Sequence, residues 1–255
     1  QPGIESLATS TLKLMKKGSS VFVNLSTLKR CLRHEINPQW NLLVGFPLEE
    51  EEVFEKYEAD LERLVHLHPP DGTFPVRFDR FSPYFMQREE YGLDLHAYDY
   101  YKLIYPFDEE SLQELAYYFM DENYDAEYFT TMIRHLVPLR QVVASWLERW
   151  DGVPGSERGG RRSDWVQPKL YLASEDASGG VIHDSRGAEA VEHRLSAPAV
   201  SILRALEEPR HKQGLAELAA ETGADLDAEL AGLDERGLLW EEHGRLLNLT
   251  LLEPY

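Results

Sequence analysis

The sequence of 255 residues is poor in cysteine and has no long apolar run. Its one cysteine, Cys31, excludes an internal disulfide framework and any zinc or iron–sulfur site built from several cysteines of this chain. A membrane-spanning helix needs about 20 consecutive apolar residues, and a secretory signal needs a basic start before an apolar stretch. Neither pattern occurs, so the sequence predicts a cytoplasmic protein without a membrane segment, in which Cys31 is a structural thiol.

Positive charge is also scarce. The chain has 26 Lys and Arg residues against 45 Asp and Glu residues, which gives a net charge of −19. Binding to a phosphate backbone needs clustered Lys and Arg, so this balance predicts no nucleic-acid partner.

Aromatic residues are concentrated before Trp150, where all ten Phe and eleven of the thirteen Tyr residues lie. After Trp150 the sequence is rich in Ala, Leu, Glu and Gly. This change predicts two domains, at residues 1–150 and 165–255, joined by a Gly- and Arg-containing linker at residues 151–164.

Apolar residues in the first half alternate between helical and strand spacing. The pattern predicts helices at residues 12–17, 20–35, 49–67 and 126–150, and buried strands at residues 40–46 and 76–82. Helices that alternate with strands are typical of parallel strands with crossover helices, so an α/β sheet or part of a barrel is expected.

The second half has a different pattern. It predicts strands at residues 169–172, 181–184 and 190–195, helices at residues 198–206, 215–221 and 226–235, and a final hairpin of residues 238–240 and 246–249. Three strands, three short helices and a terminal hairpin indicate a small winged-helix-like α+β domain.

The sharpest local motif is the apolar run Leu42 to Val44, which ends in Gly45-Phe46-Pro47. Ligands of parallel α/β proteins lie at the carboxyl ends of strands, where glycine lets the backbone approach closely. From spacing alone, a ligand loop and a plain strand end are equally good interpretations. The aromatic segment 84–107 is likewise open, either as a loop that covers a substrate or as packing across a barrel end.

The titratable residues give no strong site of their own. The run Glu49 to Glu52 is better explained as a solvated helix start than as a metal cluster. His66 and His68 lack a third ligand, so histidines of a loop or strand end are the better interpretation. No catalytic residue is identified, no metal site is predicted, and no nucleotide-binding loop or serine-hydrolase elbow is found.

Several motifs together resemble one enzyme family. Residues 1–7, with the later Leu12, Met15 and Gly18, resemble the fourth-strand motif of radical S-adenosylmethionine enzymes. Residues 40–47 resemble their fifth-strand motif, which contacts the adenosine part of the cofactor. The segments 68–70 and 80–84 narrow the resemblance to cobalamin-binding members that mature ribosomally made peptides, several of them C-methyltransferases. The resemblance covers about residues 1–107, and it departs at Leu48, where the family usually has Gly.

The resemblance implies a fold, a function and cofactors. The first half would be the second half of a radical S-adenosylmethionine partial TIM barrel, and the chain the C-terminal portion of a methyltransferase that acts on a precursor peptide. S-adenosylmethionine is the implied cofactor, with a 4Fe-4S cluster and cobalamin in the full-length enzyme. Their ligands would belong to a missing N-terminal half, itself an implied partner, so this chain alone is predicted to be inactive.

The resemblance also implies a set of cofactor-binding residues. Glu5 and Ser6 would hold the ribose or amino-acid part, Val44 to Phe46 would form the adenine wall, and Arg80 and Ser82 would meet a carboxylate or the substrate. The full set is Gln1, Gly3, Glu5, Ser6, Asn41, Val44, Gly45, Phe46, Pro47, Arg80 and Ser82.

The second half resembles, more loosely, small peptide-recognition domains related to the chaperone of pyrroloquinoline quinone synthesis. These bind a leader peptide as an added strand beside a helix, which the edge at Ala190–Leu195 and the helix Leu226–Glu235 would allow. A plain cap over the barrel is an equal alternative. DNA binding comes third, because residues 151–255 carry 11 basic and 20 acidic side chains. The rival function for the whole chain is a non-catalytic protein that binds a precursor or leader peptide.

Overall fold

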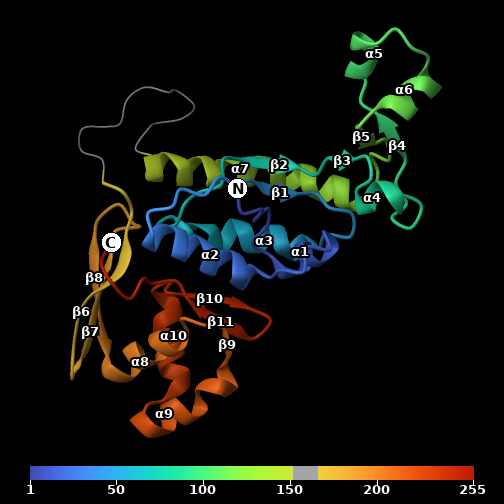
Figure 1. Cartoon of the computed structure of the whole chain (residues 1–255). Helices are drawn as coiled ribbons and strands as arrows, with labels where there is room; N and C mark the ends of the chain where they lie inside the picture. The colour runs from blue at the N-terminus through green and yellow to red at the C-terminus, as the bar shows by residue number, and fades with distance from the viewer. Residues whose placement is uncertain (152–165) are drawn as a thin grey trace.

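The computed structural model describes residues 1–151 and 166–255 (Figure 1). Within them the chain is a mixed α/β protein with several small sheets and no closed barrel. The predicted linker at residues 151–164 lies outside the described residues, except for Asp151, which ends a helix.

The body of the first half is a parallel strand pair flanked by helices. Strands β1 and β2 pair in parallel, with Leu42 opposite Thr73. Helix α7 contacts both β2 and α3, and α2 lies on the same side of α7 as α3 (Figure 1). The elements are α1 (Thr9–Leu14), α2 (Val21–Arg33), β1 (Leu42–Val44), α3 (Glu51–Asp60), the 3₁₀ turn η1 (Leu61–Leu64), β2 (Thr73–Pro75) and α7 (Glu127–Asp151).

A lobe projects from this body at the carboxyl end of the strand pair (Figure 1). Its strands form an antiparallel sheet in the order β3-β5-β4, and its own apolar cluster includes Phe78, Leu95 and Phe119. The elements are β3 (Phe78–Asp79), α4 (Pro83–Met86), β4 (Leu95–Ala97), α5 (Tyr100–Ile104), α6 (Glu109–Leu115) and β5 (Tyr118–Asp121).

The second half has the predicted succession of strands, helices and hairpin. Its first sheet is an antiparallel meander, β6-β7-β8, and its second has the order β10-β11-β9. The elements are β6 (Leu170–Asp176), β7 (Gly179–Asp184), β8 (Val191–Ser196), α8 (Ala197–Ala205), β9 (Arg210–His211), η2 (Lys212–Leu215), α9 (Ala216–Thr222), α10 (Leu226–Glu235), β10 (Leu239–Glu242) and β11 (Arg245–Asn248).

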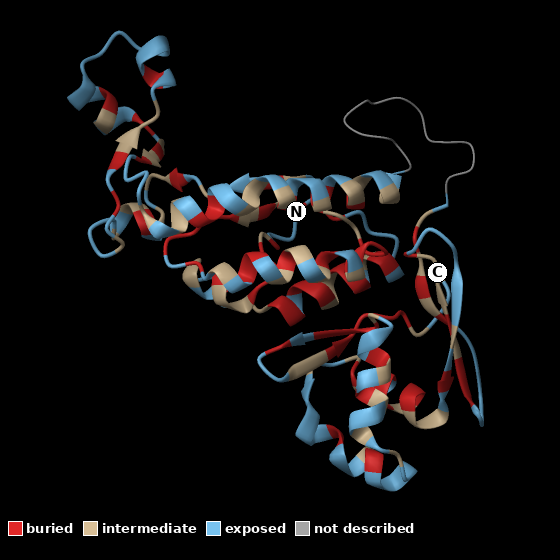
Figure 2. Cartoon of the chain, turned by 180° about the vertical axis from the view of Figure 1, so that it is seen from behind, coloured by how far each residue is buried: buried red, intermediate tan, exposed pale blue. Residues whose placement is uncertain are grey.

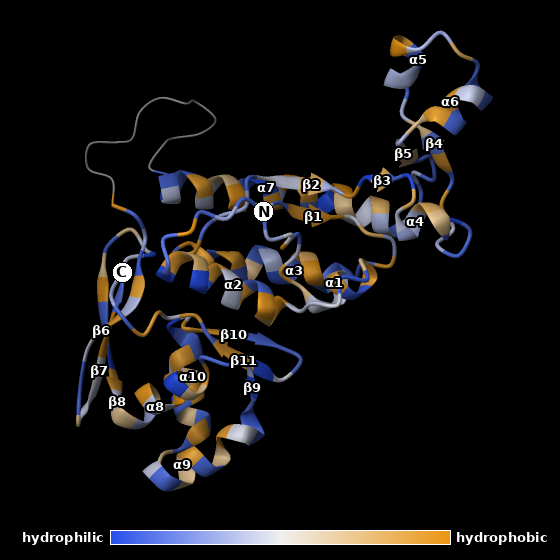
Figure 3. Cartoon of the chain, in the orientation of Figure 1, coloured by the Kyte–Doolittle hydropathy of each residue, from blue (hydrophilic) through white to orange (hydrophobic). Residues whose placement is uncertain are grey.

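One apolar core runs through both halves. It extends from Leu25 and Trp146 in the first half to Leu203 and Trp240 in the second, and buried residues line the facing sides of both halves (Figure 2). The hydropathy pattern agrees, because apolar residues turn inward on α2, α3 and α10 (Figure 3). The aromatic-rich first half and the Ala- and Leu-rich second half are therefore packed against each other.

One expectation for the first half needs correction. The strand predicted at residues 76–82 is wrong, because β2 ends at Pro75 and only Phe78–Asp79 follow as a strand, in a different sheet. Ser82 then caps α4 by accepting a hydrogen bond from the Phe85 N–H. The finer expectation of a half barrel is not shown: the parallel part has two strands among the described residues, and the lobe's sheet is antiparallel.

Candidate functional site

An open hollow of about 740 Å³ lies over the partly exposed face of β1 and β2 and extends past their carboxyl ends. Its lining combines apolar and aromatic side chains with two ion pairs, Lys17 with Glu5 and Arg77 with Asp79. The residues that line it include Glu5, Met15, Lys17, Asn41, Leu43, Phe46, Phe74, Val76, Arg77, Asp79, Ser82, Tyr84 and Tyr98. The carboxyl ends are the edge at which ligands of parallel α/β proteins bind, and the hollow joins four residues of the predicted set: Glu5, Asn41, Phe46 and Ser82.

The segment before α1 forms one rim of the hollow. The Leu43 N–H donates a 2.8 Å hydrogen bond to the Glu5 carbonyl, so this segment runs beside β1. The Glu5 carboxylate forms a 2.7 Å ion pair with Lys17, and the same ammonium donates to the Gly3 carbonyl. Both side chains stay partly exposed, so this rim offers one anion and one cation to a ligand.

The loop after β1 is held by Glu49. Its Oε2 accepts hydrogen bonds from the N–H groups of Gly45 (2.6 Å) and Phe46 (3.1 Å), and its Oε1 accepts one from the Thr11 hydroxyl (2.6 Å). The side chain is only 7% exposed, and burial raises the pKa of the carboxyl. The prediction that Glu49 belongs to a solvated helix start is therefore wrong.

Gly45 is required for a different reason from the predicted one. Its φ is +81°, and a Cβ at this position would lie 2.7 Å from the Cγ of Met132 on α7. Glycine thus allows the loop to pass close to α7, and its N–H is taken by Glu49. Val44 is fully buried in the core and Pro47 is buried, so of Gly45, Phe46 and Pro47 only Phe46 lines the hollow, together with Leu43 of the strand.

Tyr84 gives the hollow an unsatisfied polar group. The side chain is 5% exposed and its ring lies 6.0 Å from that of Phe46, yet its hydroxyl has no hydrogen-bond partner among the described residues. Burial, with Tyr91 and Glu49 nearby, raises the pKa of Tyr84, so the hydroxyl stays protonated and can donate. Sequence reasoning missed this residue, which lies in the first turn of α4.

The other predicted residues lie elsewhere. The Ser6 hydroxyl is buried and 2.9 Å from the Tyr57 hydroxyl. The Arg80 guanidinium donates to the carbonyls of Gln113 and Ala116 inside the lobe, away from the hollow that it was expected to face. Gln1 is exposed, and Gly3 meets the rim through its carbonyl alone.

His66, His68 and Cys31, the histidines and the cysteine considered from the sequence, contact only residues of the protein's own fold. His66 is fully buried with its Nε2 3.0 Å from the Leu249 carbonyl, and the His68 ring packs on Trp150. Cys31 lies on α2 as predicted, and burial raises its pKa. In residues 1–151 and 166–255, no group of three or more His, Cys, Asp or Glu side chains is arranged to hold a metal ion.

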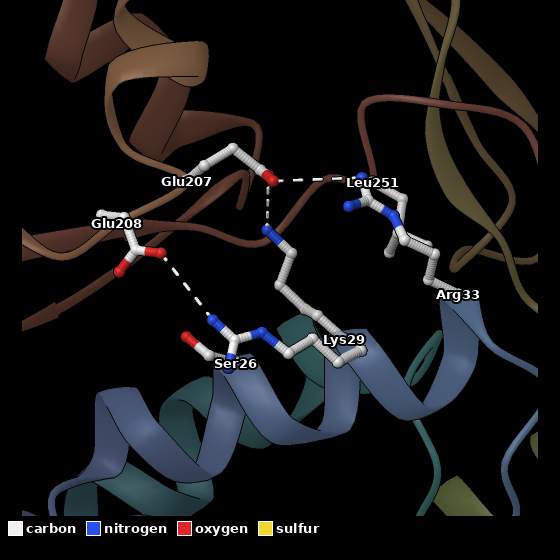
Figure 4. A pocket seen from close by; sticks show the side chains of 7 residues that line it. Ser26, Lys29, Arg33, Glu207, Glu208 and Leu251 are labelled. Carbon is white, nitrogen blue, oxygen red and sulfur yellow. Dashed lines mark hydrogen bonds and ion pairs between the residues drawn. The ribbon is translucent and has the colours of Figure 1, made fainter.

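A second, smaller pocket of about 160 Å³ lies where the two halves meet (Figure 4). The buried Lys29 on α2 donates to Glu207 (3.0 Å) and to the Asn248 carbonyl (2.7 Å). Arg30 and Arg33 of the same helix lie near Glu208 and Glu207. Each cation already faces an acid of the other half, so this pocket joins the halves.

Within the described residues, no helix is long and apolar enough to cross a membrane. Comparison with models of protein families, with curated proteins and with solved structures finds no match to this chain. The geometry of the hollow alone therefore indicates its chemistry: an apolar wall, a buried hydroxyl donor and a charged rim suit a small ligand with one flat apolar part and one zwitterionic part.

Proposed function

We propose that the hollow binds S-adenosylmethionine and that the chain is part of a radical S-adenosylmethionine enzyme of ribosomal peptide maturation, with cobalamin-dependent C-methylation as the reaction of the complete enzyme. The observation that carries the proposal is the unpartnered, buried Tyr84 hydroxyl in a hollow that extends past the carboxyl ends of β1 and β2. A parallel strand pair with a crossover helix is also the repeating unit of a TIM barrel, which supports the partial-barrel interpretation.

The backbone conformation at Leu48, in the loop after β1, supports the resemblance although the residue itself differs. Leu48, where the family usually has Gly, has a φ of +69°. Glycine is the residue that adopts this left-handed conformation without steric cost. The backbone thus keeps the shape that the family's sequence favours, although the side chain differs.

The residues of this chain would bind and orient the cofactor. Phe46 and Leu43 provide the apolar wall for adenine, and the Tyr84 hydroxyl donates to an acceptor of the adenosine. Lys17 and Glu5 match the carboxylate and the ammonium of the methionine part. The cofactors themselves would supply the radical and methyl-transfer chemistry, with cluster and cobalamin ligands provided by the N-terminal half.

A titration of the whole chain with S-adenosylhomocysteine tests this assignment. We expect saturable binding by calorimetry, weakened about tenfold by Tyr84→Phe, which deletes only the donor. Tyr91→Phe is the matched control, because its ring packs on Tyr84 but does not line the hollow. No heat at millimolar ligand, or equal binding by the two variants, would reject the assignment.

A specific observation favours a second function, leader-peptide binding by the C-terminal half. Among the described residues, β8 pairs with β7 alone, so its outer edge is open over Val191–Ser196. The outer edge of β6 is occupied in part by Leu251. The open edge lies beside α10, since the Ser196 hydroxyl donates to Glu229 of that helix. A non-catalytic peptide-binding protein would need this edge and not the hollow.

Anisotropy with the labelled leader of the cognate precursor separates these functions. We expect Val191→Glu, on the open edge, to weaken leader binding by about tenfold. Val166→Glu is the control, because Val166 is also exposed but lies outside the strand. Equal binding by both variants would exclude strand addition at β8.

A further inference from the structure

Five aromatic rings form a continuous stack on the projecting lobe. The row, hereafter the aromatic row, consists of Tyr98, Tyr100, Tyr101, Tyr105 and Phe107. Successive ring centroids are 5.6, 4.7, 6.3 and 6.0 Å apart, and every interplanar angle is 25° or less. Tyr101 anchors the row, because its hydroxyl accepts hydrogen bonds from the N–H groups of Tyr117 and Tyr118.

Three rings of the aromatic row, Tyr100, Tyr105 and Phe107, are exposed, whereas Tyr98 is half-buried and Tyr101 is buried. Leu103 is 88% exposed and Phe107 is 53% exposed, and Ile104, Tyr105 and Leu115 are exposed as well. The lobe carrying α5 and α6 stands away from the rest of the chain (Figures 1 and 3). Apolar surface gathered on a projection is typical of an interaction site.

The aromatic row is continuous with the hollow. Tyr98, its first ring, also lines the hollow that extends past the carboxyl ends of β1 and β2. The remaining rings lead away from that point, and their four steps span at most about 23 Å. Roughly seven residues of extended peptide cover such a length.

The charge of the lobe selects the partner. Residues 98–117 contain five acids and one cation, Lys102, and Lys102 is engaged by Asp99 and Glu109. Among the described residues, Glu110 and Glu114 on α6 form no ion pair. They add local negative potential to a chain that already has a net charge of −19, so a cationic partner is favoured.

We propose that the aromatic row is the docking track for an extended cationic peptide with apolar side chains, which it leads into the hollow. The inference rests on the proposed function in naming this peptide as the substrate region of the precursor. Two other occupants are disfavoured by charge: a second copy of the lobe would bring like charges together, and an anionic lipid surface would repel the acids.

Binding of two synthetic peptides to the whole chain tests the proposal. The probe is a blocked, fluorescent peptide of about nine residues that alternates Arg, Pro and Leu, and its counterpart has Glu in place of each Arg. We expect the Arg peptide to bind at least about tenfold more tightly, with an affinity that falls as salt is added. Equal affinities for the two peptides would overturn the proposal.

Two variants locate the binding surface. We expect Tyr105→Ser with Phe107→Ser to weaken binding of the Arg peptide about tenfold, and Glu110→Lys with Glu114→Lys to do the same. The matched controls are Ile133→Ser with Val137→Ser on α7, and Glu217→Lys with Glu221→Lys on α9, which change equally exposed residues elsewhere. Circular dichroism verifies that each variant is folded, and binding by either lobe variant at the wild-type level would overturn the proposal.

Titration of the same samples with S-adenosylhomocysteine separates this inference from the proposed function. Peptide binding without S-adenosylhomocysteine binding would reject the cofactor assignment and leave the docking track supported. The reverse result would reject the track alone. Sedimentation provides one more check, because a dimer that forms with concentration and is lost in the Tyr105 and Phe107 double variant would assign the surface to a second copy and overturn the proposal.

Discussion

The backbone N–H of Gly45 donates a 2.6 Å hydrogen bond to the carboxylate of Glu49, four residues later. The loop between them turns back on itself, with positive φ at Gly45 and Leu48. A carboxylate that was expected to lie in solvent thereby becomes the acceptor for two N–H groups of the loop that walls the hollow. The helix start and the candidate site are thus one structural unit.

Replacing Glu49 tests this unit. Glu49→Ala leaves the buried N–H groups of Gly45 and Phe46 without an acceptor, which costs about 3 kcal/mol of unfolding free energy. Glu49→Gln keeps one oxygen for both N–H groups, and its amide can donate to the Thr11 hydroxyl, so we expect less than half of that loss. Urea unfolding of the three proteins measures the difference. An alanine variant as stable as the glutamine variant would show that the loop does not depend on this acceptor.

The charge of Glu49 predicts a dependence on pH. Burial raises the pKa of the carboxyl above its ordinary value of 4.5 in the folded state. A raised carboxyl pKa means that this contribution to stability is complete below pH 4.5 and declines as pH rises through the folded-state value. Relative to wild type, Glu49→Gln should therefore gain stability between pH 4.5 and neutrality. Chemical unfolding along a pH series measures this gain, and a constant difference would contradict it.

The parts of the fold that follow from the sequence are those with regular spacing. Val21, Leu25, Leu28 and Leu32 predict one buried helix face, and all four are buried on α2. The final hairpin was also predictable, because the turn residues Glu242-His243-Gly244 separate two apolar runs. In the structure His243 and Gly244 both have the positive φ that a tight turn needs. In these segments the local pattern and the tertiary contacts favour the same structure.

Side-chain direction in the irregular segments did not follow from the sequence. Arg80 binds carbonyl groups at Gln113 and Ala116, more than 30 residues away, and nothing in the local pattern indicates this choice. The same holds for Ser6 and Tyr84. The Ser6 hydroxyl, which was expected to contact the cofactor, is instead hydrogen-bonded to Tyr57, whereas the buried Tyr84 hydroxyl has no partner among the described residues. The sequence therefore did not predict which side chains of these segments line the hollow.

The ion pair between Lys29 and Glu207 predicts a strong effect at the junction of the halves. Lys29 is almost fully buried and also donates to the Asn248 carbonyl. Lys29→Met removes the donor to the Asn248 carbonyl and leaves Glu207 only its longer pair with Arg33, and we expect a loss of about 2 kcal/mol, less than for a fully buried pair because Glu207 is partly exposed. Arg30→Met is the control, because its pair with Glu208 is exposed and such pairs contribute about 0.5 kcal/mol or less. Similar losses in the two variants would contradict a special role for Lys29.

His66 predicts acid sensitivity of the same junction. Burial, and then the nearby Arg186, lowers the pKa of His66 to about 3, although the Leu249 carbonyl and Asp184 oppose the shift. A lowered His pKa means that stability is complete above the ordinary value of 6.5 and falls as pH drops below it. At pH 5 this cost is about 2 kcal/mol. We expect His66→Gln to lose less stability than wild type between pH 7 and pH 5 in urea unfolding, whereas His96→Gln, an exposed control, should behave as wild type.

Filling the hollow separates its role in binding from its role in folding. Val76 lines the hollow and is partly exposed; its backbone N–H donates to the Val44 carbonyl, and its side chain packs only at the margin of the lobe's apolar cluster. Val76→Trp adds bulk where the ligand would lie, so we expect S-adenosylhomocysteine binding to fall at least about tenfold while the thermal midpoint changes by only about 2 °C. Val137→Trp adds the same ring on the exposed side of α7 and should bind as wild type does. If the folded Val76→Trp protein bound the ligand at full strength, the ligand would lie elsewhere, because a tryptophan at this position and an adenosine in the hollow compete for the same space.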